Sequence, residues 1–109
     1  MKSRILAVDD DLGTLNAMEI VFKGTGYILD VSLTAHDCLS KIKSSPIAYS
    51  LVFVDHNLSS DGAGENGDAL ARKIKDINPA IMVVMVSGDR SPDALKSWLK
   101  AGVDQFLVK

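Results

Sequence analysis

The sequence predicts one α/β domain built on an open, doubly wound parallel sheet. Short apolar, β-leaning runs alternate along the chain with segments whose apolar residues recur at helical spacing. The run from Ile81 to Val86 is continuously apolar, which is typical of a strand covered on both faces in a parallel sheet. Because crossovers between parallel strands are right-handed, this alternation favours helices on both faces of one five-stranded sheet.

In the first half of the chain, strand and helix signals alternate twice. A strand at Ile5–Val8 ends abruptly at three acidic residues, and a helix follows that ends at Gly24–Gly26. A second strand, at Ile28–Leu33, precedes a helix that must stop before Pro46. The apolar residues that indicate the two helices are Leu15, Met18, Val21 and Phe22 in the first, and Ala35, Leu39 and Ile42 in the second.

The second half repeats the alternation. A strand at Leu51–Val54 ends on Asp55 and is followed by a loop at 57–67 that is rich in Ser, Asp, Asn and Gly. A helix carrying Leu70, Ile74 and Ile77 leads to the apolar strand at 81–86, and Gln105–Val108 is the predicted last strand. The helix between them has Ser91 as N-cap, Pro92 at its first position, Leu95 and Leu99 as an apolar stripe and Gly102 at its C-terminal turn.

Composition narrows the functional class. The 109 residues, 47% of them hydrophobic, suit a single domain spanning 1–109. The net charge is −2 and the 12 Lys and Arg residues are spread along the chain, so we expect no direct nucleic-acid partner. The single cysteine, Cys38, lies in an apolar helical pattern and is expected to be a buried structural residue. The N-terminal segment is neither a signal peptide nor a membrane span, which favours a cytoplasmic location away from any membrane.

Chemically active side chains follow the carboxyl ends of four predicted strands. They are Asp9 and Asp10, then Asp55, then Ser87, then Lys109. In an open α/β sheet these ends form the functional crevice, so we expect the side chains to converge there. Clustered carboxylates repel one another, and a hard divalent cation relieves that repulsion. We therefore expect Mg²⁺ bound by Asp10, Asp55 and the backbone carbonyl of Asn57, with Asp9 as a further ligand, directly or through water.

Asp55 is the predicted nucleophile of this crevice. With a cation in place, one oxygen of its carboxylate is free to attack phosphorus and form an acyl phosphate. Lys109 and Ser87 are expected to contact the phosphoryl oxygens, because little bond chemistry remains beyond positioning and charge neutralisation. No turnover of an external substrate is expected, only the phosphorylation and dephosphorylation of the protein itself.

Four segments, ILAVDDD (5–11), LVFVD (51–55), MVSG (85–88) and FLVK (106–109), resemble the receiver domain of two-component response regulators, in order and over nearly the whole chain. The resemblance implies a flavodoxin-like strand order 2-1-3-4-5 and a phosphoryl group taken from the phosphohistidine of a sensor histidine kinase or phosphotransfer protein. It also implies that Phe106 is the aromatic switch residue, which moves when the Ser87 hydroxyl is drawn toward the phosphoryl group.

The sequence departs from the family pattern at two places. The loop after Asp55 is longer and lacks the usual proline, so Gly67 is the expected counterpart of the family glycine, and Asp61 and Glu65 are added near the crevice. The second departure is the fifth helix, which is absent from this sequence. One sheet face should then expose an apolar patch, and we expect either that the sequence is a fragment or that it forms a homodimer through this face.

Several local alternatives stand beside these assignments. Asp11 is expected to be a helix N-cap only, and Trp98 either lies near the Phe106 ring or is an ordinary packing residue. His36 and His56 have no ligand partner at helical spacing and are expected to face solvent. Asn57 and Asp89, two residues beyond Asp55 and Ser87, occupy positions that flank the path of a hydrolytic water in this family.

Three other functions compete with phosphoryl acceptance. A receiver-like protein-binding module that takes no phosphate is the main alternative. A magnesium phosphohydrolase generally requires an acid two residues past its nucleophile, where this chain has Asn57. A flavin-binding domain is disfavoured because the acids at 9–11 would repel a phosphate.

Overall fold

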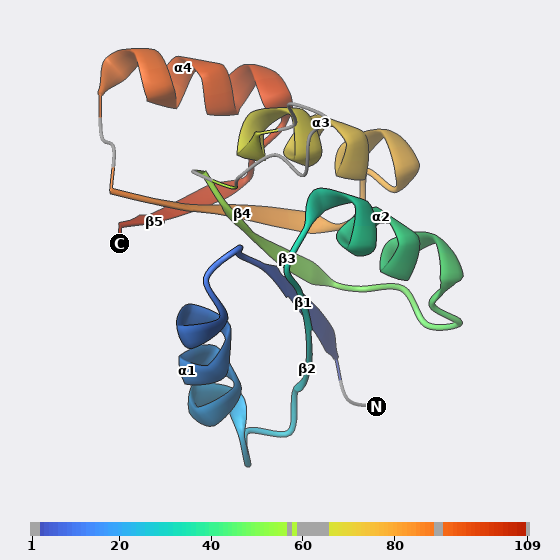
Figure 1. The fold of residues 1–109 in the computed structure, drawn as a ribbon. Helices are drawn as coiled ribbons and strands as arrows, with labels where there is room; N and C mark the ends of the chain where they lie inside the picture. The colour runs from blue at the N-terminus through green and yellow to red at the C-terminus, as the bar shows by residue number, and fades with distance from the viewer. Residues whose placement is uncertain (1–2, 57, 59–65, 89–90, 109) are drawn as a thin grey trace.

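Five parallel strands form a single sheet in the order β2-β1-β3-β4-β5 (Figure 1). The structure, a computed structural model, describes residues 3–56, 58, 66–88 and 91–108. The predicted fold class and strand order are therefore confirmed. The strands are β1 (Arg4–Val8), β2 (Ile28–Ser32), β3 (Leu51–Asp55), β4 (Met82–Ser87) and β5 (Gln105–Val108).

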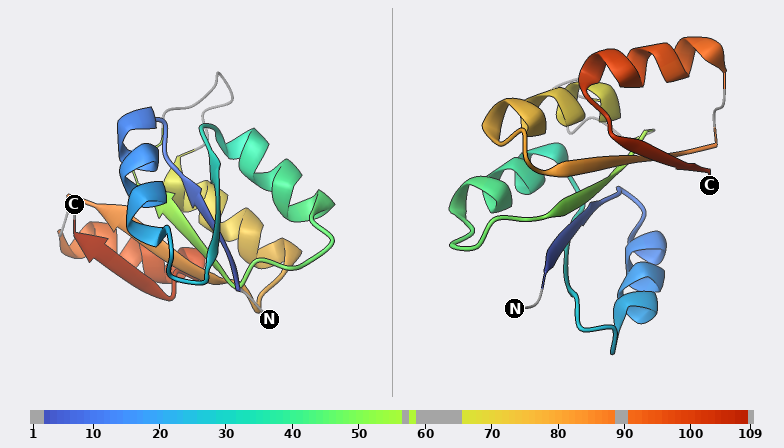
Figure 2. Two further views of the ribbon diagram at one scale, coloured as in Figure 1. Left: turned by 90° about the horizontal axis from the view of Figure 1, so that it is seen from below. Right: turned by 180° about the vertical axis from the view of Figure 1, so that it is seen from behind.

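Four helices connect the strands and pack on both faces of the sheet. α1 lies on one face, whereas α2, α3 and α4 cover the other (Figures 1 and 2). The described residues form no fifth helix, in agreement with the prediction. Within the described ranges, no helix has both the length and the apolar character that a membrane span requires. The helices are α1 (Leu12–Phe22), α2 (Ala35–Ser44), α3 (Gly67–Ile77) and α4 (Pro92–Ala101).

Side chains that accept backbone N–H groups define where each helix starts. Asp11 caps α1 by accepting from the Gly13 amide at 3.0 Å, as predicted. Ser91 caps α4 at the Ala94 amide, Pro92 occupies the first turn, and Gly102 ends the helix in the left-handed conformation at φ 88°. These local contacts satisfy groups that have no partner within a helix, which explains why short-range signals predicted the boundaries well.

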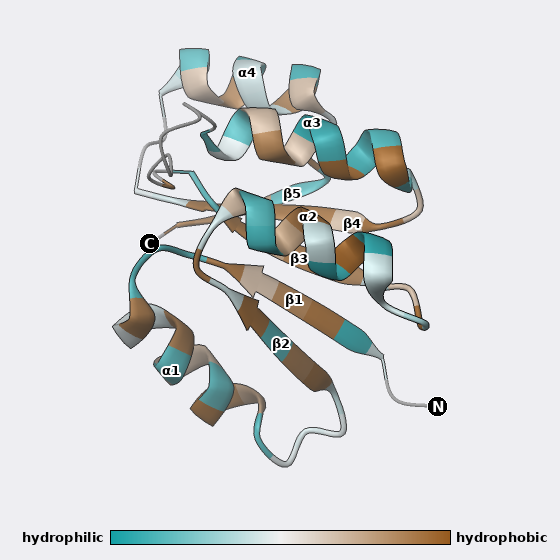
Figure 3. Ribbon diagram, turned by 45° about the vertical axis from the view of Figure 1, so that its right-hand side comes forward, coloured by the Kyte–Doolittle hydropathy of each residue, from teal (hydrophilic) through white to brown (hydrophobic). Residues whose placement is uncertain are grey.

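The main core lies between the sheet and the three-helix face. Alternate residues of the central strands point into it, among them Leu6 and Val8 of β1, Val52 and Val54 of β3, and Val83 and Met85 of β4. In Figure 3 the central strands are largely brown, and α2 and α3 lie over them. Cys38 is buried in this core, and burial raises the pKa of its thiol to about 12, so the structural assignment of Cys38 is confirmed.

The buried stripe of α4 differs from the predicted one. Leu99 is 74% exposed, and the helix instead buries Ala94, Trp98 and Ala101. Both sets have helical spacing, so the sequence alone did not separate them. Tertiary packing buries the face that carries Trp98, because the indole fills the space between α4 and the sheet.

The opposite face of the sheet is only partly covered. In α1 only Leu15 is fully buried, and Val21 is 70% exposed. A groove of about 400 Å³ runs between α1 and the sheet; it is lined mainly by apolar residues, including Phe53, Val86 and Leu107. The prediction of an exposed apolar patch is confirmed. The nature of its cover, whether a further segment or a second copy, stays a prediction.

Gly67, the first residue of α3, is required by a close approach of backbones. A Cβ at this position would lie 2.7 Å from the carbonyl oxygen of Asp55 and 3.0 Å from the Cα of His56. We expect Gly67→Ala to lower the free energy of unfolding by about 1–3 kcal/mol, because α3 would have to shift away from the end of β3. Urea unfolding followed by circular dichroism measures the change.

Gly88→Ala is the matched control, since a Cβ there has nothing within 4 Å. Equal unfolding midpoints for the two variants would show that the contact at Gly67 is not tight.

Candidate functional site

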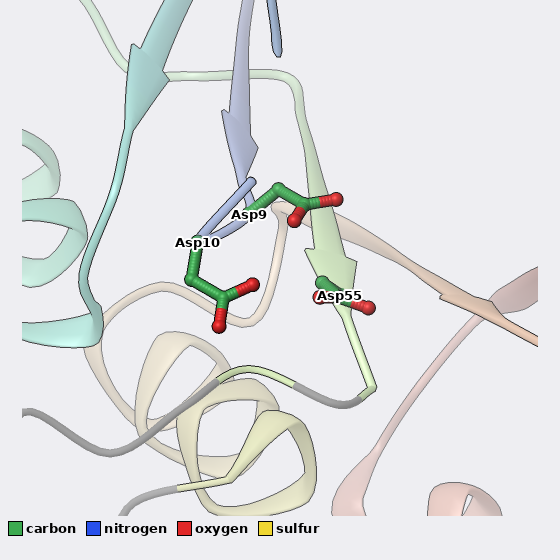
Figure 4. Close-up of side chains that lie close together, drawn as sticks. All are labelled: Asp9, Asp10 and Asp55. Carbon is green, nitrogen blue, oxygen red and sulfur yellow. The ribbon is translucent and has the colours of Figure 1, made fainter. Parts of the chain in front are cut away.

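The strand register brings three carboxylates to one edge of the sheet. Val8 on β1 is aligned with Val54 on the neighbouring β3, so Asp9 and Asp55 follow at the same level. β1 and β3 are also the strands between which the order reverses, where α/β sheets leave a crevice. Carboxylate oxygens of Asp9, Asp10 and Asp55 lie within 4.8 Å of one another, and Figure 4 shows the three side chains converging from the two strand ends.

The cluster combines two buried carboxylates with one exposed carboxylate. Asp9 and Asp55 are only 4% and 3% exposed, whereas Asp10 is exposed. Oxygen donors at this spacing are the ligands that Mg²⁺ and Ca²⁺ prefer, and a divalent cation would offset the repulsion among them. The donor set therefore fits a hard divalent cation, as predicted from the sequence.

One oxygen of Asp9 has a structural role. It accepts a hydrogen bond from the backbone amide of Asp11 at 2.9 Å, and the amide of Asp9 donates to the carbonyl oxygen of Ser32 at 3.1 Å. These two bonds hold the turn between β1 and α1 in place. The carboxylates are thus preorganised by the same short segment that starts α1.

Ser87, the last residue of β4, is buried with 1% exposure at the same edge. Its Oγ lies 3.2 Å from Nδ1 of His56. The prediction that His56 faces solvent is therefore wrong: the histidine side chain is 21% exposed and lies between Ser87, Asp68 and Trp98. His36, in contrast, is exposed on α2 as predicted.

The position of the His56 side chain follows from the alternation of side chains along an extended backbone. Val52, Val54 and His56 lie at every second position, so they share the face that α3 and α4 cover, while Asp55 points the other way. This period-two pattern was present in the sequence and could have predicted the partly buried environment of His56. Asp68, 3.8 Å from His56, gave no such signal, because its contact depends on how α3 packs.

Phe106 and Trp98 are neighbours, so both interpretations of Trp98 hold. The indole is 2% exposed and its ring centroid lies 5.7 Å from that of Phe106. Phe106 itself is 47% exposed on β5, beside a pocket of about 200 Å³ lined by Leu95, Trp98 and Leu99 among others. Its role as the switch residue stays a prediction. Several predicted positions lie outside the described residues: Asn57, Asp61, Glu65, Asp89 and Lys109.

A sequence model of the response regulator receiver domain matches residues 5–109. The chain belongs to this family. It is a receiver domain of the kind found in two-component response regulators.

The alignment with a curated relative covers nearly the whole of this chain but only part of the relative. The transcriptional regulatory protein ZraR of Salmonella typhimurium is 30% identical over 108 residues, which cover 99% of this chain and 23% of ZraR. The chain thus spans about a quarter of that relative's length.

Solved structures agree with this assignment. The CheY-like response regulator receiver domain protein of Methanospirillum hungatei superposes with a TM-score of 0.88 at 28% identity, covering 100% of this chain and 82% of the other. NtrX of Brucella abortus gives a TM-score of 0.84 at 29% identity, covering 100% and 24%.

Removing one charge from the acidic cluster should stabilise the cation-free protein. We expect Asp10→Asn to raise the free energy of unfolding by roughly 1 kcal/mol in chelator-treated buffer, because two unit charges about 4 Å apart in water repel by that amount. Adding a divalent cation should reverse the ranking of variant and wild type, since the variant loses a ligand. Thermal unfolding with and without the cation measures both effects.

Asp93→Asn removes the same charge from the exposed first turn of α4, outside the cluster. It should not stabilise the protein in either buffer. A gain for Asp93→Asn equal to that for Asp10→Asn would point to net charge rather than the cluster.

Proposed function

We propose that this chain is the phosphoacceptor domain of a two-component phosphorelay and that Asp55 receives the phosphoryl group. The observation that carries the proposal is the position of Asp55, whose buried carboxylate ends β3 within 4.8 Å of the oxygens of Asp9 and Asp10. The phosphoryl donor is the phosphohistidine of a sensor histidine kinase or of a phosphotransfer protein.

Asp9, Asp10 and Asp55 would hold Mg²⁺, with the backbone carbonyl of Asn57 as a further ligand. Mg²⁺ takes few protein oxygens and retains waters, which suits a site that is open at Asp10. When bound, the cation supplies positive charge that offsets the charge of the carboxylates and of the phosphoryl oxygens.

In the transfer step, an oxygen of Asp55 attacks phosphorus in line with the donor nitrogen. The O–P bond forms, the P–N bond breaks, and the electron pair of that bond returns to the imidazole, which takes a proton from solvent. The Lys109 ammonium and the Ser87 hydroxyl contact the transferred oxygens, so catalysis by the protein consists of positioning and charge neutralisation.

The output is a change in a protein-interaction surface. Phe106 lies on β5 and its ring contacts Trp98 of α4, so a movement of Phe106 would alter the surface formed by these two elements. The ZraR and NtrX relatives are longer proteins, and ZraR is described as a transcriptional regulator. We infer that any nucleic-acid binding of the whole protein belongs to another domain, because this domain has no concentrated basic segment.

Intact-mass measurement tests the acceptor. Incubation with Mg²⁺ and acetyl phosphate should add the mass of one phosphoryl group to the wild type, and Asp55→Asn should add none. Chelation of the cation should reduce the added fraction by about tenfold or more, because the neutralising charge is lost.

Asp93→Asn should be phosphorylated like the wild type, since that residue lies on the exposed first turn of α4. If the wild type gains no mass, the module that binds partners without phosphorylation becomes the better description. A gain of phosphoryl mass by Asp55→Asn would show that another residue is the acceptor.

A further inference from the structure

A chain of four polar side chains leads away from the phosphorylation crevice into the helical layer. It begins at Ser87 at the end of β4, passes through His56 after β3 and Asp68 on α3, and ends at Ser97 on α4. The family resemblance assigned a role to Ser87 alone. The other three residues have no role in the phosphoryl-transfer step described above.

The contacts of His56 are specific at both ring nitrogens. Nδ1 lies 3.2 Å from Oγ of Ser87, and Nε2 lies 3.8 Å from Oδ1 of Asp68. Oδ1 of Asp68 is buried and has no hydrogen-bond partner among the described residues, whereas Oδ2 accepts a hydrogen bond from the Ser97 hydroxyl. The carboxylate is therefore held by α4 with one oxygen aimed at the imidazole.

Packing fixes the plane of the imidazole. The His56 ring meets the Trp98 indole in an edge arrangement, with centroids 5.1 Å apart and an interplanar angle of 78°. Both side chains lie in the layer between the sheet and α4, and Trp98 is 2% exposed. A ring held on one side by an indole and on another by a carboxylate has little freedom to reorient.

The position of the Asp68 carboxylate favours one of the two tautomers of His56. An imidazole with one hydrogen has one donor and one acceptor nitrogen, and the neighbour of each nitrogen decides between the two tautomers. A lone pair on Nε2 would face the negative Oδ1 of Asp68, which is unfavourable. This contact favours the tautomer with the hydrogen on Nε2, in which Nδ1 is the acceptor for Ser87.

A serine hydroxyl has a single hydrogen to donate. When it donates to Nδ1 of His56, it cannot at the same time donate to a phosphoryl oxygen on Asp55. Both acceptors lie near the same edge of the sheet, because Ser87 and Asp55 end neighbouring strands. The two interactions of the hydroxyl are then mutually exclusive.

We propose that His56 is a positioning residue that holds the Ser87 hydroxyl in the unphosphorylated state, oriented by Asp68, and that a phosphoryl group on Asp55 takes this hydrogen bond over. This inference deepens the proposed function and rests on it. Loss of the Ser87 bond removes one of the contacts that hold His56 against Trp98, so the competition links the acceptor site to α4 and, through the ring contact at 5.7 Å, to Phe106.

Nitrogen NMR of the imidazoles tests the resting state directly. The chain has two histidines, so His36 on the exposed face of α2 serves as an internal reference. We expect His56 to carry its hydrogen on Nε2, with an Nδ1 shift typical of a hydrogen-bond acceptor that changes in Ser87→Ala. A hydrogen on Nδ1, or an Nδ1 signal unaffected by Ser87→Ala, would overturn the proposal.

A double-mutant cycle of His56→Phe and Ser87→Ala, with the extent of phosphorylation as its readout, tests the competition. His56→Phe keeps a flat ring against Trp98 but removes both nitrogens, so the hydroxyl is released. With acetyl phosphate and Mg²⁺, the ratio of phosphorylated to unphosphorylated protein should rise about three- to tenfold, which corresponds to one lost competing hydrogen bond. In the Ser87→Ala background His56→Phe should have no effect, because there is no hydroxyl to release.

His36→Phe is the matched control for a histidine-to-phenylalanine change and should leave the ratio unchanged. An equal effect of His56→Phe with and without Ser87 would assign His56 a purely structural role and sink the inference, while phosphorylation of Asp55 would stand. If the wild type takes no phosphoryl group at all, the proposed function fails instead, and the NMR signature alone decides whether His56 holds Ser87.

Discussion

The site depends on three like charges being kept close together. Two of the three carboxylates are almost inaccessible to water, and all three belong to neighbouring strand ends. The mutual repulsion of these charges is unfavourable, and the stability of the rest of the fold helps to offset it. The apolar core between the sheet and α2, α3 and α4 contributes to this stability, and hydrogen bonds fix the turn after β1.

The alternation of side chains along a strand places two consecutive residues, Asp55 and His56, in different parts of the domain. Asp55 ends β3 and His56 follows it directly, yet their side chains point to opposite sides of the sheet. One therefore lies at the acidic cluster and the other lies in the helical layer, in contact with Trp98 of α4. Ser87 is the point at which the two sides meet, because it ends the neighbouring strand and contacts His56. A change at the crevice thereby has a short route to α4 and β5.

The helices cover the two faces of the sheet to different extents. Three helices bury one face, but α1 alone leaves an apolar groove beside β5 on the other. β5 is exposed along its length, and Phe106 forms part of that exposed strand. The part of ZraR that aligns with this chain is about a quarter of that protein.

Local signals in the sequence determined the elements and the candidate site. Asp11, Ser91 and Gly102 fixed helix ends through contacts within a few residues, and the acids after β1 and β3 had to meet once a parallel sheet was accepted. Only the tertiary structure decided that α4 buries Trp98 rather than Leu99 and that Asp68 faces His56. The physical reason is distance along the chain: a cap or a strand end is set by neighbours in sequence, whereas these contacts depend on the rotation of one helix against another.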